Sequence, residues 1–191
     1  EPKKRVITIS TMKLKVNRNY FNNGLQQVPQ IVKNQAGMPI LTHVLLEADP
    51  TTGTVALSTT NLDTAVRCLI QAEVQEAGCM TLPVHRLCAI VKELPHEEVF
   101  LESRGQDQVK LTSGGATFHI VGMPGEQFPQ MASVDDGAEI VLQQNAFLRM
   151  LRSVSYAQSA DENRYILNGV YFSLRGTGLR LVATDGRRLA M

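Results

Sequence analysis

The residue types that most often carry catalysis are scattered along this chain and form no recognisable reactive set. The four histidines, His43, His85, His96 and His119, fall in separate predicted elements, and none has a partner at metal-ligand spacing. Cys88 lies on the apolar stripe of a predicted helix, which favours a buried thiol over a nucleophile. We therefore expect no enzymatic active site, no metal ion and no cofactor.

Two short motifs have both a catalytic and a structural interpretation. Asp161 and Glu162 could share a proton, but adjacent carboxylates ahead of a strand are more often loop residues exposed to water. Gly176-Thr177-Gly178 resembles part of a nucleotide-binding loop. Because it joins two predicted strands, it cannot direct a helix N-terminus at a phosphate, and we predict a hairpin turn there.

The residues best suited to contact an anion are arginines on one predicted helix. When the apolar side chains of this helix face inward, Arg149, Arg152 and Tyr156 share the opposite face. Two guanidinium groups one turn apart can contact phosphates; the alternative is an ordinary solvated helix face. Arg164 and Tyr165 place a cation beside an aromatic ring, which suits stacking on nucleic acid or, alternatively, simple packing.

Composition limits the class of protein. The 191 residues are 43% hydrophobic, enough for a sizeable core, and no stretch approaches the roughly 20 apolar residues of a membrane span. The net charge of +1 means that any nucleic-acid contact depends on where cations are placed. The three cysteines lack close pairing, and residues 1–11 have no apolar signal-peptide core, so we expect a cytoplasmic protein.

Hydrophobic periodicity predicts helices packed on antiparallel strands. Asn19 can cap a helix with the apolar stripe Phe21, Leu25 and Val28, and a second helix runs from Pro83 to Leu94. The predicted strands are residues 40–48, a strand around 55–57, an extended stretch at 80–82, and residues 99–102, 109–112 and 117–121, followed by an extended connector at 122–131. This pattern predicts the α+β class.

The chain also begins to repeat itself. Residues Asn19, Phe21, Leu25, Val28, Ile40, Leu41 and Val44 recur as Asn145, Phe147, Leu151, Val154, Ile166, Leu167 and Val170, each 126 positions later. Such a repeat predicts a duplicated domain. We expect a tail at 1–11, a complete first domain at 12–131, a linker at 132–136 and the first half of a second domain at 137–191, as in an N-terminal piece of a longer tandem-domain protein.

Several segments carry a resemblance to a known family. Asn163–Val170 and Leu181–Ala190 resemble the middle domain of the bacterial DNA polymerase III beta subunit, the sliding clamp family. Similarity to the first domain of that family is found in Met38–Leu41, Thr60–Asp63, Cys79–Pro83, Gly122–Pro124 and Phe128-Pro129. The resemblance extends from Met12 to Met191.

The resemblance implies a fold and a function. In that family three similar domains form a crescent, and two crescents close head to tail into a ring around duplex DNA. We therefore expect a DNA clamp fold with helices on the inner face and strands outside. The implied function is a non-catalytic, homodimeric processivity factor that binds duplex DNA without sequence preference and tethers DNA polymerase, clamp loader and repair proteins through short peptide motifs. The alternative is a stand-alone protein or nucleic-acid interaction module built on the same repeat.

Together with the helix analysis, the resemblance assigns three sets of residues. The DNA-facing set is Asn23, Gln26, Lys33, Arg149, Arg152, Arg164 and Tyr165. The partner-peptide groove is assigned to Leu167, Thr184, Gly186, Arg187, Arg188 and Leu189, and the subunit interface to Arg86, Ile90, Phe118 and Ile120. Two residues depart from the family pattern: Arg187 stands where relatives commonly have His, and Gln35 stands where some relatives place a DNA-contacting Arg.

Overall fold

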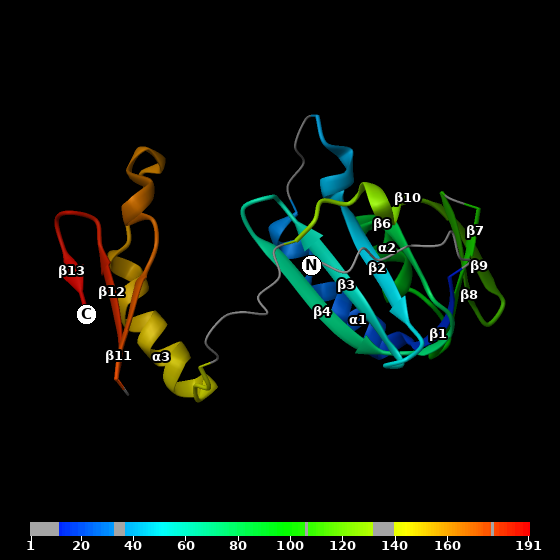
Figure 1. Ribbon diagram of the computed structural model, residues 1–191, viewed down its shortest axis with the longest axis horizontal. Helices are drawn as coiled ribbons and strands as arrows, with labels where there is room; N and C mark the ends of the chain where they lie inside the picture. Colours follow the sequence, from blue (N-terminus) through cyan, green and yellow to red (C-terminus); the bar gives the residue numbers. More distant parts are fainter. Residues whose placement is uncertain (1–11, 33–36, 106, 132–139, 177) are drawn as a thin grey trace, which may run out of the picture. The chain divides into compact units, whose positions relative to one another are not determined.

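The chain folds as two compact units, Glu1–Ala132 and Ser133–Met191 (Figure 1). The computed structural model describes residues 12–32, 37–105, 107–131, 140–176 and 178–191. The expected tail at 1–11 and linker at 132–136 lie outside the described residues, as do Lys33 and Gln35. No helix in the described ranges is long and apolar enough to cross a membrane.

The first unit starts with strand β1 (Lys13–Asn17), which leads directly into helix α1 (Arg18–Gln27). The predicted cap at Asn19 is wrong: the side chain of Asn17 accepts a hydrogen bond from the N–H of Asn19 at 2.9 Å. Asn17 has the extended backbone that a capping residue needs, whereas Asn19 is already helical. The predicted apolar stripe is confirmed, because Phe21 and Leu25 are fully buried.

Two five-stranded antiparallel sheets follow, with orders β5-β1-β7-β8-β9 and β10-β6-β2-β3-β4. Their elements are β2 (His43–Asp49), β3 (Thr54–Thr60), β4 (Ala65–Gln71), β5 (Glu73–Glu76), β6 (Gly78–Pro83), helix α2 (Val84–Lys92), β7 (Glu98–Arg104), β8 (Gln108–Ser113), β9 (Ala116–Val121) and β10 (Met123–Pro124). Short 3-10 turns occupy Pro29–Ile31, Pro39–Thr42 and Gly125–Gln127. The strand predicted from residue 40 therefore begins only at His43.

The topology of this unit has an internal two-fold pattern. The order β1-α1-β2-β3-β4-β5 is repeated as β6-α2-β7-β8-β9-β10, and each half places its first strand in the other half's sheet. β1 pairs with β7 so that Leu14 lies opposite Leu101, and β6 pairs with β2 so that Met80 lies opposite Leu46. Neither half can therefore cover its apolar face without the other.

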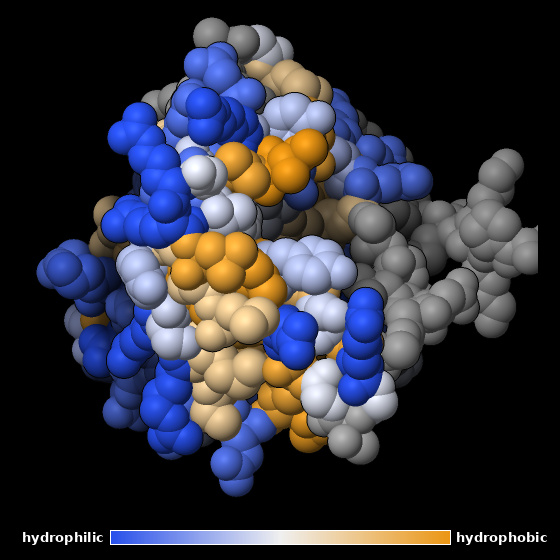
Figure 2. Space-filling view, turned by 90° about the vertical axis from the view of Figure 1, so that its left-hand side faces the viewer, coloured by the Kyte–Doolittle hydropathy of each residue, from blue (hydrophilic) through white to orange (hydrophobic). Residues whose placement is uncertain are grey.

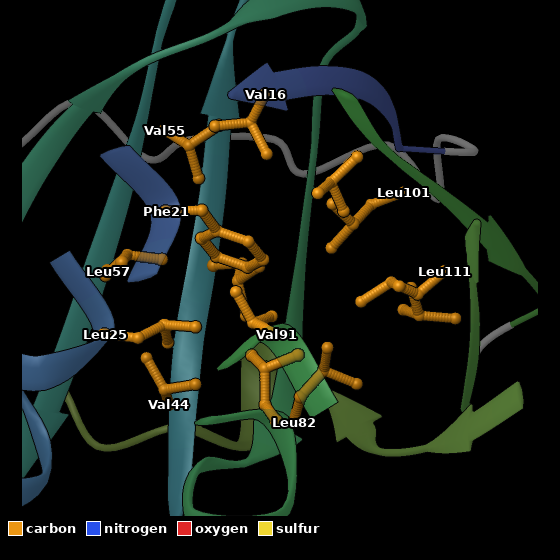
Figure 3. Packing of buried hydrophobic residues seen from close by; sticks show 14 of the residues in the cluster. Val16, Phe21, Leu25, Val44, Val55, Leu57, Leu82, Val91, Leu101 and Leu111 are labelled. Carbon is orange, nitrogen blue, oxygen red and sulfur yellow. The ribbon is translucent and has the colours of Figure 1, made fainter. Parts of the chain in front are cut away.

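The core lies between the two sheets and the helices (Figure 3). Phe21 from α1 and Val91 from α2 point into it, where they meet strand residues such as Leu57, Leu82 and Leu101. All five side chains are at most 1% exposed. Burying each contributes about 1.5–3 kcal/mol relative to exposure, so this cluster is the main stabilising element of the first unit.

The second unit contains α3 (Gln144–Val154), β11 (Tyr171–Arg175), β12 (Gly178–Thr184) and β13 (Leu189–Ala190), with 3-10 turns at Ser155–Ala157 and Glu162–Leu167. The strands form one antiparallel sheet in the order β11-β12-β13. α3, β11 and β12 follow one another as α1, β2 and β3 do, so the predicted repeat is present in the structure. Arg175 pairs with Gly178, which confirms the predicted hairpin.

A close helix-to-sheet contact in the first unit gives a test of the packing. A Cβ atom added at Gly24 on α1 would lie 2.7 Å from Cγ2 of Ile70 and 3.0 Å from Cδ1 of Leu57. We predict that Gly24→Ala lowers the unfolding free energy by up to about 2 kcal/mol, because overpacking costs about 1–3 kcal/mol and the gain in helix propensity is only about 1 kcal/mol.

Urea unfolding of the chain measures this effect. The control is Gly115→Ala in the β8–β9 turn, where an added Cβ meets nothing within 4 Å and the expected change is below about 0.5 kcal/mol. A stabilised Gly24→Ala variant would show that α1 does not pack this tightly on the sheet.

Candidate nucleic-acid and partner-binding surfaces

The outer face of α1 is polar and uncharged. Asn23, Gln26 and Gln27 are exposed on this face. Arg18, at the first position, is the one charged residue of the helix. The Arg18 guanidinium donates to the carbonyl of Leu94 at 2.7 Å, which holds it against the fold. This face can therefore offer amide hydrogen bonds without a fixed charge.

The outer face of α3 is basic at the corresponding positions. Arg149 and Arg152 are exposed, whereas Val154 on the opposite side is buried and the ring of Phe147 packs 6.0 Å from that of Phe172. Within the described part of the chain, neither arginine has an acidic side chain at ion-pair distance. Both guanidinium groups are exposed to solvent, which suits contact with an anionic ligand.

None of the 18 acidic residues of the chain lies in α1, α2 or α3. Acidic side chains would repel a phosphate backbone, and they occur instead in strands and loops of both units. The three helices of the described residues thus present surfaces that do not repel a polyanion.

Arg164 and Tyr165 belong to the 3-10 turn Glu162–Leu167, ahead of β11, which begins at Tyr171. Nε of Arg164 lies 3.7 Å from a carboxylate oxygen of Asp161, so part of its charge is neutralised locally. Tyr165 is 77% exposed and free to stack on a ligand.

A hollow of about 440 Å³ opens on the second unit next to β11 and β12. Its lining consists of Ile166, Leu167, Gly169, Val170, Tyr171, Val182, Ala183 and Thr184. Of the predicted groove residues, only Leu167 and Thr184 line this hollow, while Gly186, Arg187, Arg188 and Leu189 are exposed on the adjoining turn and on β13. The other lining residues were not predicted, although Val170 and Val182 lie in the segments 163–170 and 181–190 that carry the family resemblance.

The turn between β12 and β13 is shaped by Asp185, which sequence reasoning also missed. Its carboxylate accepts hydrogen bonds from the N–H groups of Arg187 and Arg188, both at 2.9 Å, and from Nε of Arg188 at 3.0 Å. The two backbone donors, followed by the charge of Arg188, lower the pKa of Asp185 below its usual value. Gly186 has φ +86°, a conformation that favours glycine.

The first unit contains the same turn. Asn61 accepts from the N–H groups of Asp63 and Thr64, at 3.1 and 2.7 Å, and Leu62 takes φ 78° where the second unit has Gly186. A threonine hydroxyl precedes each turn and donates across it, from Thr60 at 3.0 Å and from Thr184 at 2.7 Å. The local hydrogen bonding is thus repeated along with the larger elements.

Arg188 is held from two sides. In addition to Asp185, its guanidinium lies 5.7 Å from the ring centroid of Tyr156, within the range of a cation–π interaction. Tyr156, which the helix analysis grouped with Arg149 and Arg152, therefore contacts the turn beside the hollow. This places an oriented cation next to an apolar recess.

The residues predicted for a subunit interface are only partly on the surface. Arg86 is exposed and Ile90 half-buried on α2, and Phe118 is 36% exposed on β9, an edge strand of its sheet. The assignment of Ile120 to this surface is wrong. Its side chain is 1% exposed, because it faces the core between the sheets.

The cysteine thiols and possible metal ligands of the sequence form no reactive site among the described residues. Burial raises the pKa of the Cys88 thiol, which donates to the carbonyl of Leu25 at 3.5 Å and packs against the core. All three cysteines are free thiols. Among the described residues, no three His, Cys, Asp or Glu side chains are grouped so that they could hold a metal ion.

The two units define a class of protein: an α+β fold in which helices pack on antiparallel sheets, with the helix-strand-strand order of the first unit repeated in the second. Residues 12–132 match the family described as DNA polymerase III beta subunit, N-terminal domain, and residues 141–191 match its central domain. The chain belongs to the DNA polymerase III beta subunit family, and its fold is the DNA clamp fold.

Individual relatives agree with this assignment. The chain is 30% identical over 179 residues to the beta sliding clamp of Chlamydia muridarum, covering 94% of this chain and 48% of that protein. A solved beta sliding clamp from C. crescentus matches with TM-score 0.85 and 32% identity, covering 95% of this chain and 50% of that one. A sliding clamp from Bartonella birtlesii bound to griselimycin matches with TM-score 0.83 and 32% identity, covering 94% and 48%. The chain spans about half the length of these relatives.

The lowered pKa of Asp185 gives a pH-dependent prediction. Because the folded-state pKa lies below the unfolded value, the turn is stabilised above pH about 4 and loses this stabilisation as the pH falls through the folded pKa. We predict that an NMR titration gives Asp185 a pKa below 3.8, the value of an aspartate free of such contacts.

We also expect Asp185→Ala to release the Arg188 side chain, seen as faster exchange of its Nε–H. Asp63→Ala is the matched control and leaves Arg188 unchanged. An Asp185 pKa at or above 3.8 would contradict the hydrogen bonding described for the turn.

Proposed function

We propose that this chain acts in a DNA polymerase processivity factor, a ring-shaped sliding clamp that encircles duplex DNA and tethers polymerase and repair proteins. Membership of the DNA polymerase III beta subunit family supports the proposal, together with the beta sliding clamp relatives. The role is non-catalytic and cytoplasmic: the protein holds other enzymes on DNA and performs no chemistry itself.

The observation that carries the proposal is the absence of acidic residues from the three α-helices of the described chain. A clamp must tolerate phosphates close to its inner face without fixing its position on the DNA. Amide side chains at Asn23 and Gln26 and guanidinium groups at Arg149 and Arg152 suit this task, since they contact phosphates and read no base sequence. Helices would then form the inner face and strands the outer face.

Partner proteins would bind on the second unit. We propose that the hollow beside Leu167 and Thr184 takes an apolar side chain of a short peptide from the polymerase, clamp loader or repair proteins. The turn at 185–188 would present the Arg188 guanidinium to a carbonyl or carboxylate of that peptide. Ring closure in a homodimer would use Arg86, Ile90 and Phe118.

The second candidate is a stand-alone protein or nucleic-acid interaction module. Such a module would use the same surfaces as a clamp but would not enclose the DNA. It would therefore bind linear and circular DNA equally, whereas a clamp slides off the ends of linear DNA. Retention of the protein on nicked circular duplex, lost on linearisation, would distinguish a ring that encloses DNA from a module that binds its surface.

The helix surface is tested by charge removal. We predict that Arg149→Ala with Arg152→Ala weakens binding to mixed-sequence duplex DNA and reduces the slope of log K against log salt by about 1.8, since each phosphate contact contributes about 0.9. Fluorescence anisotropy over a salt series measures this.

The control removes the same charge from a different place. Arg175 on β11 and Arg180 on β12 are exposed on strands, and their double alanine variant is expected to keep a slope close to that of the unmodified chain. Equal loss in the two double variants would mean that α3 is not the DNA-binding face.

The hollow is tested with griselimycin, the ligand of the Bartonella birtlesii clamp. We predict that the chain binds it and that Leu167→Asp weakens binding at least about tenfold, because a carboxylate is costly to bury against an apolar ligand. Calorimetric titration measures the affinity.

Leu69→Asp is the matched control, because Leu69 is an exposed leucine of the first unit. Binding that is insensitive to Leu167→Asp, or equally reduced by Leu69→Asp, would show that the hollow is not the ligand site.

A further inference from the structure

The first unit has a small apolar cluster that is separate from its main core. Four buried side chains form it, each between 1% and 8% exposed: Ile40, Leu41, Leu45 and Phe128. The first three come from the 3-10 turn Pro39–Thr42 and from β2, whereas Phe128 follows the 3-10 turn Gly125–Gln127. Figure 1 shows this later segment in yellow-green beside the turn at Pro39–Thr42. The cluster therefore joins two parts of the chain that are far apart in sequence.

The cluster lies on the face of the sheet that points away from the main core. Val44 and Leu46 on β2 belong to the main core, so Leu45 between them faces the opposite side. Phe128 belongs to the same cluster as Leu45 and is 6% exposed, so its ring is covered on this outer face. We call the recess formed by Ile40, Leu41 and Leu45 the Phe128 seat. The chain fills this seat with its own side chain.

Residues 123–131, which we call the strap, carry Phe128 to the seat. Met123 pairs with Thr81 of β6, whose hydroxyl also donates to the carbonyl of Met123 at 3.0 Å. Among the described residues, strand pairing of the strap ends at Pro124. The N–H of Phe128 donates to a carbonyl of the strap itself, that of Gly125, at 3.1 Å. Side-chain burial, above all that of Phe128, therefore holds the rest of the strap on the sheet.

The seat corresponds to the hollow of the second unit. The repeat spacing of 126 positions relates the three residues of the seat to three lining residues of the hollow, Ile166, Leu167 and Tyr171. Figure 2, viewed from the side of the second unit, shows apolar residues at its surface. Both units thus build an apolar recess from the same positions, and in the first unit the strap fills it.

Two buried polar atoms beside the seat have no hydrogen-bond partner among the described residues. They are Nδ1 of His43 and the hydroxyl of Ser58, in residues that are 8% and 0% exposed. His43 lies two residues before Leu45 on β2, and Ser58 lies opposite Leu45 on β3, so both side chains share the outer face with the cluster. The strap therefore fills the apolar part of the recess and leaves two costly unpaired groups next to it.

We infer that the first unit has a peptide-binding site of the same construction as the hollow, and that the strap keeps this site closed as a displaceable internal ligand. The ligand class is a short extended peptide that places an aromatic side chain in the Phe128 seat and a hydrogen-bonding group beside His43 and Ser58. The peptide class rests on the proposed function, whereas the seat and its occupant are features of the first unit alone. The closed strap would direct partner peptides to the hollow.

The first experiment supplies the strap as a separate molecule. The probe is a fluorescent peptide with the sequence of residues 123–131, and Phe128→Ala in the chain empties the seat. A tethered segment acts at a high effective concentration, so the strap of the unmodified chain competes with the probe. We expect Phe128→Ala to bind the probe at least about tenfold more tightly than the unmodified chain, measured by fluorescence anisotropy. A probe with alanine in place of its phenylalanine is the control and should bind neither chain.

The binding site is located by a matched pair of substitutions in the Phe128→Ala chain. Leu41→Ala removes apolar surface from the seat, and we expect it to weaken probe binding about tenfold. Leu167→Ala removes the corresponding side chain from the hollow and should leave probe binding unchanged. Neither Leu41 nor Phe128 belongs to the main core, so these variants should keep the fold, which circular dichroism checks.

The second experiment loosens the strap with Phe128 in place. A Cβ atom added at Gly125 would clash with Sγ of Cys79 on β6, so Gly125→Ala should lift the strap. We expect faster amide hydrogen exchange across residues 125–131, followed by mass spectrometry, together with tighter probe binding. Gly115→Ala is the control, because an added Cβ there meets nothing within 4 Å.

Three results would overturn the inference. They are probe binding that Phe128→Ala does not strengthen, probe binding that is lost with Leu167→Ala and kept with Leu41→Ala, and strap exchange that Gly125→Ala leaves unchanged. A chain that binds griselimycin at the hollow and gives any of these results would keep the proposed function and lose the second site.

Discussion

The exchange of first strands between half-domains is the constraint on which the rest of the structure depends. β1 pairs with β7 in the sheet of the second half, and β6 pairs with β2 in the sheet of the first half. Both pairings place apolar side chains between the sheets. Because each helix follows an exchanged strand directly, the exchange also fixes where α1 and α2 lie, side by side over a common core. The outer faces of the helices are therefore set by the same hydrogen bonds that close the core.

This arrangement separates two kinds of surface. The outer face of α1 in the first unit carries amide groups, that of α3 in the second unit carries guanidinium groups, and neither helix contains a carboxylate, which suits contact with a phosphate backbone. The strand side of the second unit carries an apolar hollow and a turn stiffened by Asp185, which suits recognition of a short peptide. A clamp needs both, because it must be indifferent to DNA sequence and selective for its protein partners.

The sequence predicted elements whose hydrophobic residues recur with a clear helical period. It missed features that depend on strand pairing or on hydrogen bonds within a turn. The stripe of Phe21 and Leu25 was predictable because a 3.6-residue period needs only local information. Strand β1 was missed because Lys13 and Lys15 make the segment look polar. Leu14 and Val16 alternate with these lysines and are buried only by pairing with β7. Ile120 was assigned to the subunit interface through the family resemblance, and its burial depends on the facing sheet, which a strand pattern alone does not show. Asp185 was read as part of a motif, whereas its role comes from hydrogen bonds to Arg187 and Arg188 that only the folded turn reveals.

Whether α1 and α3 face DNA can be measured by following the backbone amides during titration with a mixed-sequence duplex. NMR would report each amide of α1, α3 and the strands separately at low salt. We expect the shifts to concentrate around Asn23 and Gln26 on α1 and around Arg149 and Arg152 on α3, and we expect added salt to reverse them. Shifts confined to strands such as β8 and β11, with α1 and α3 unaffected, would contradict this expectation.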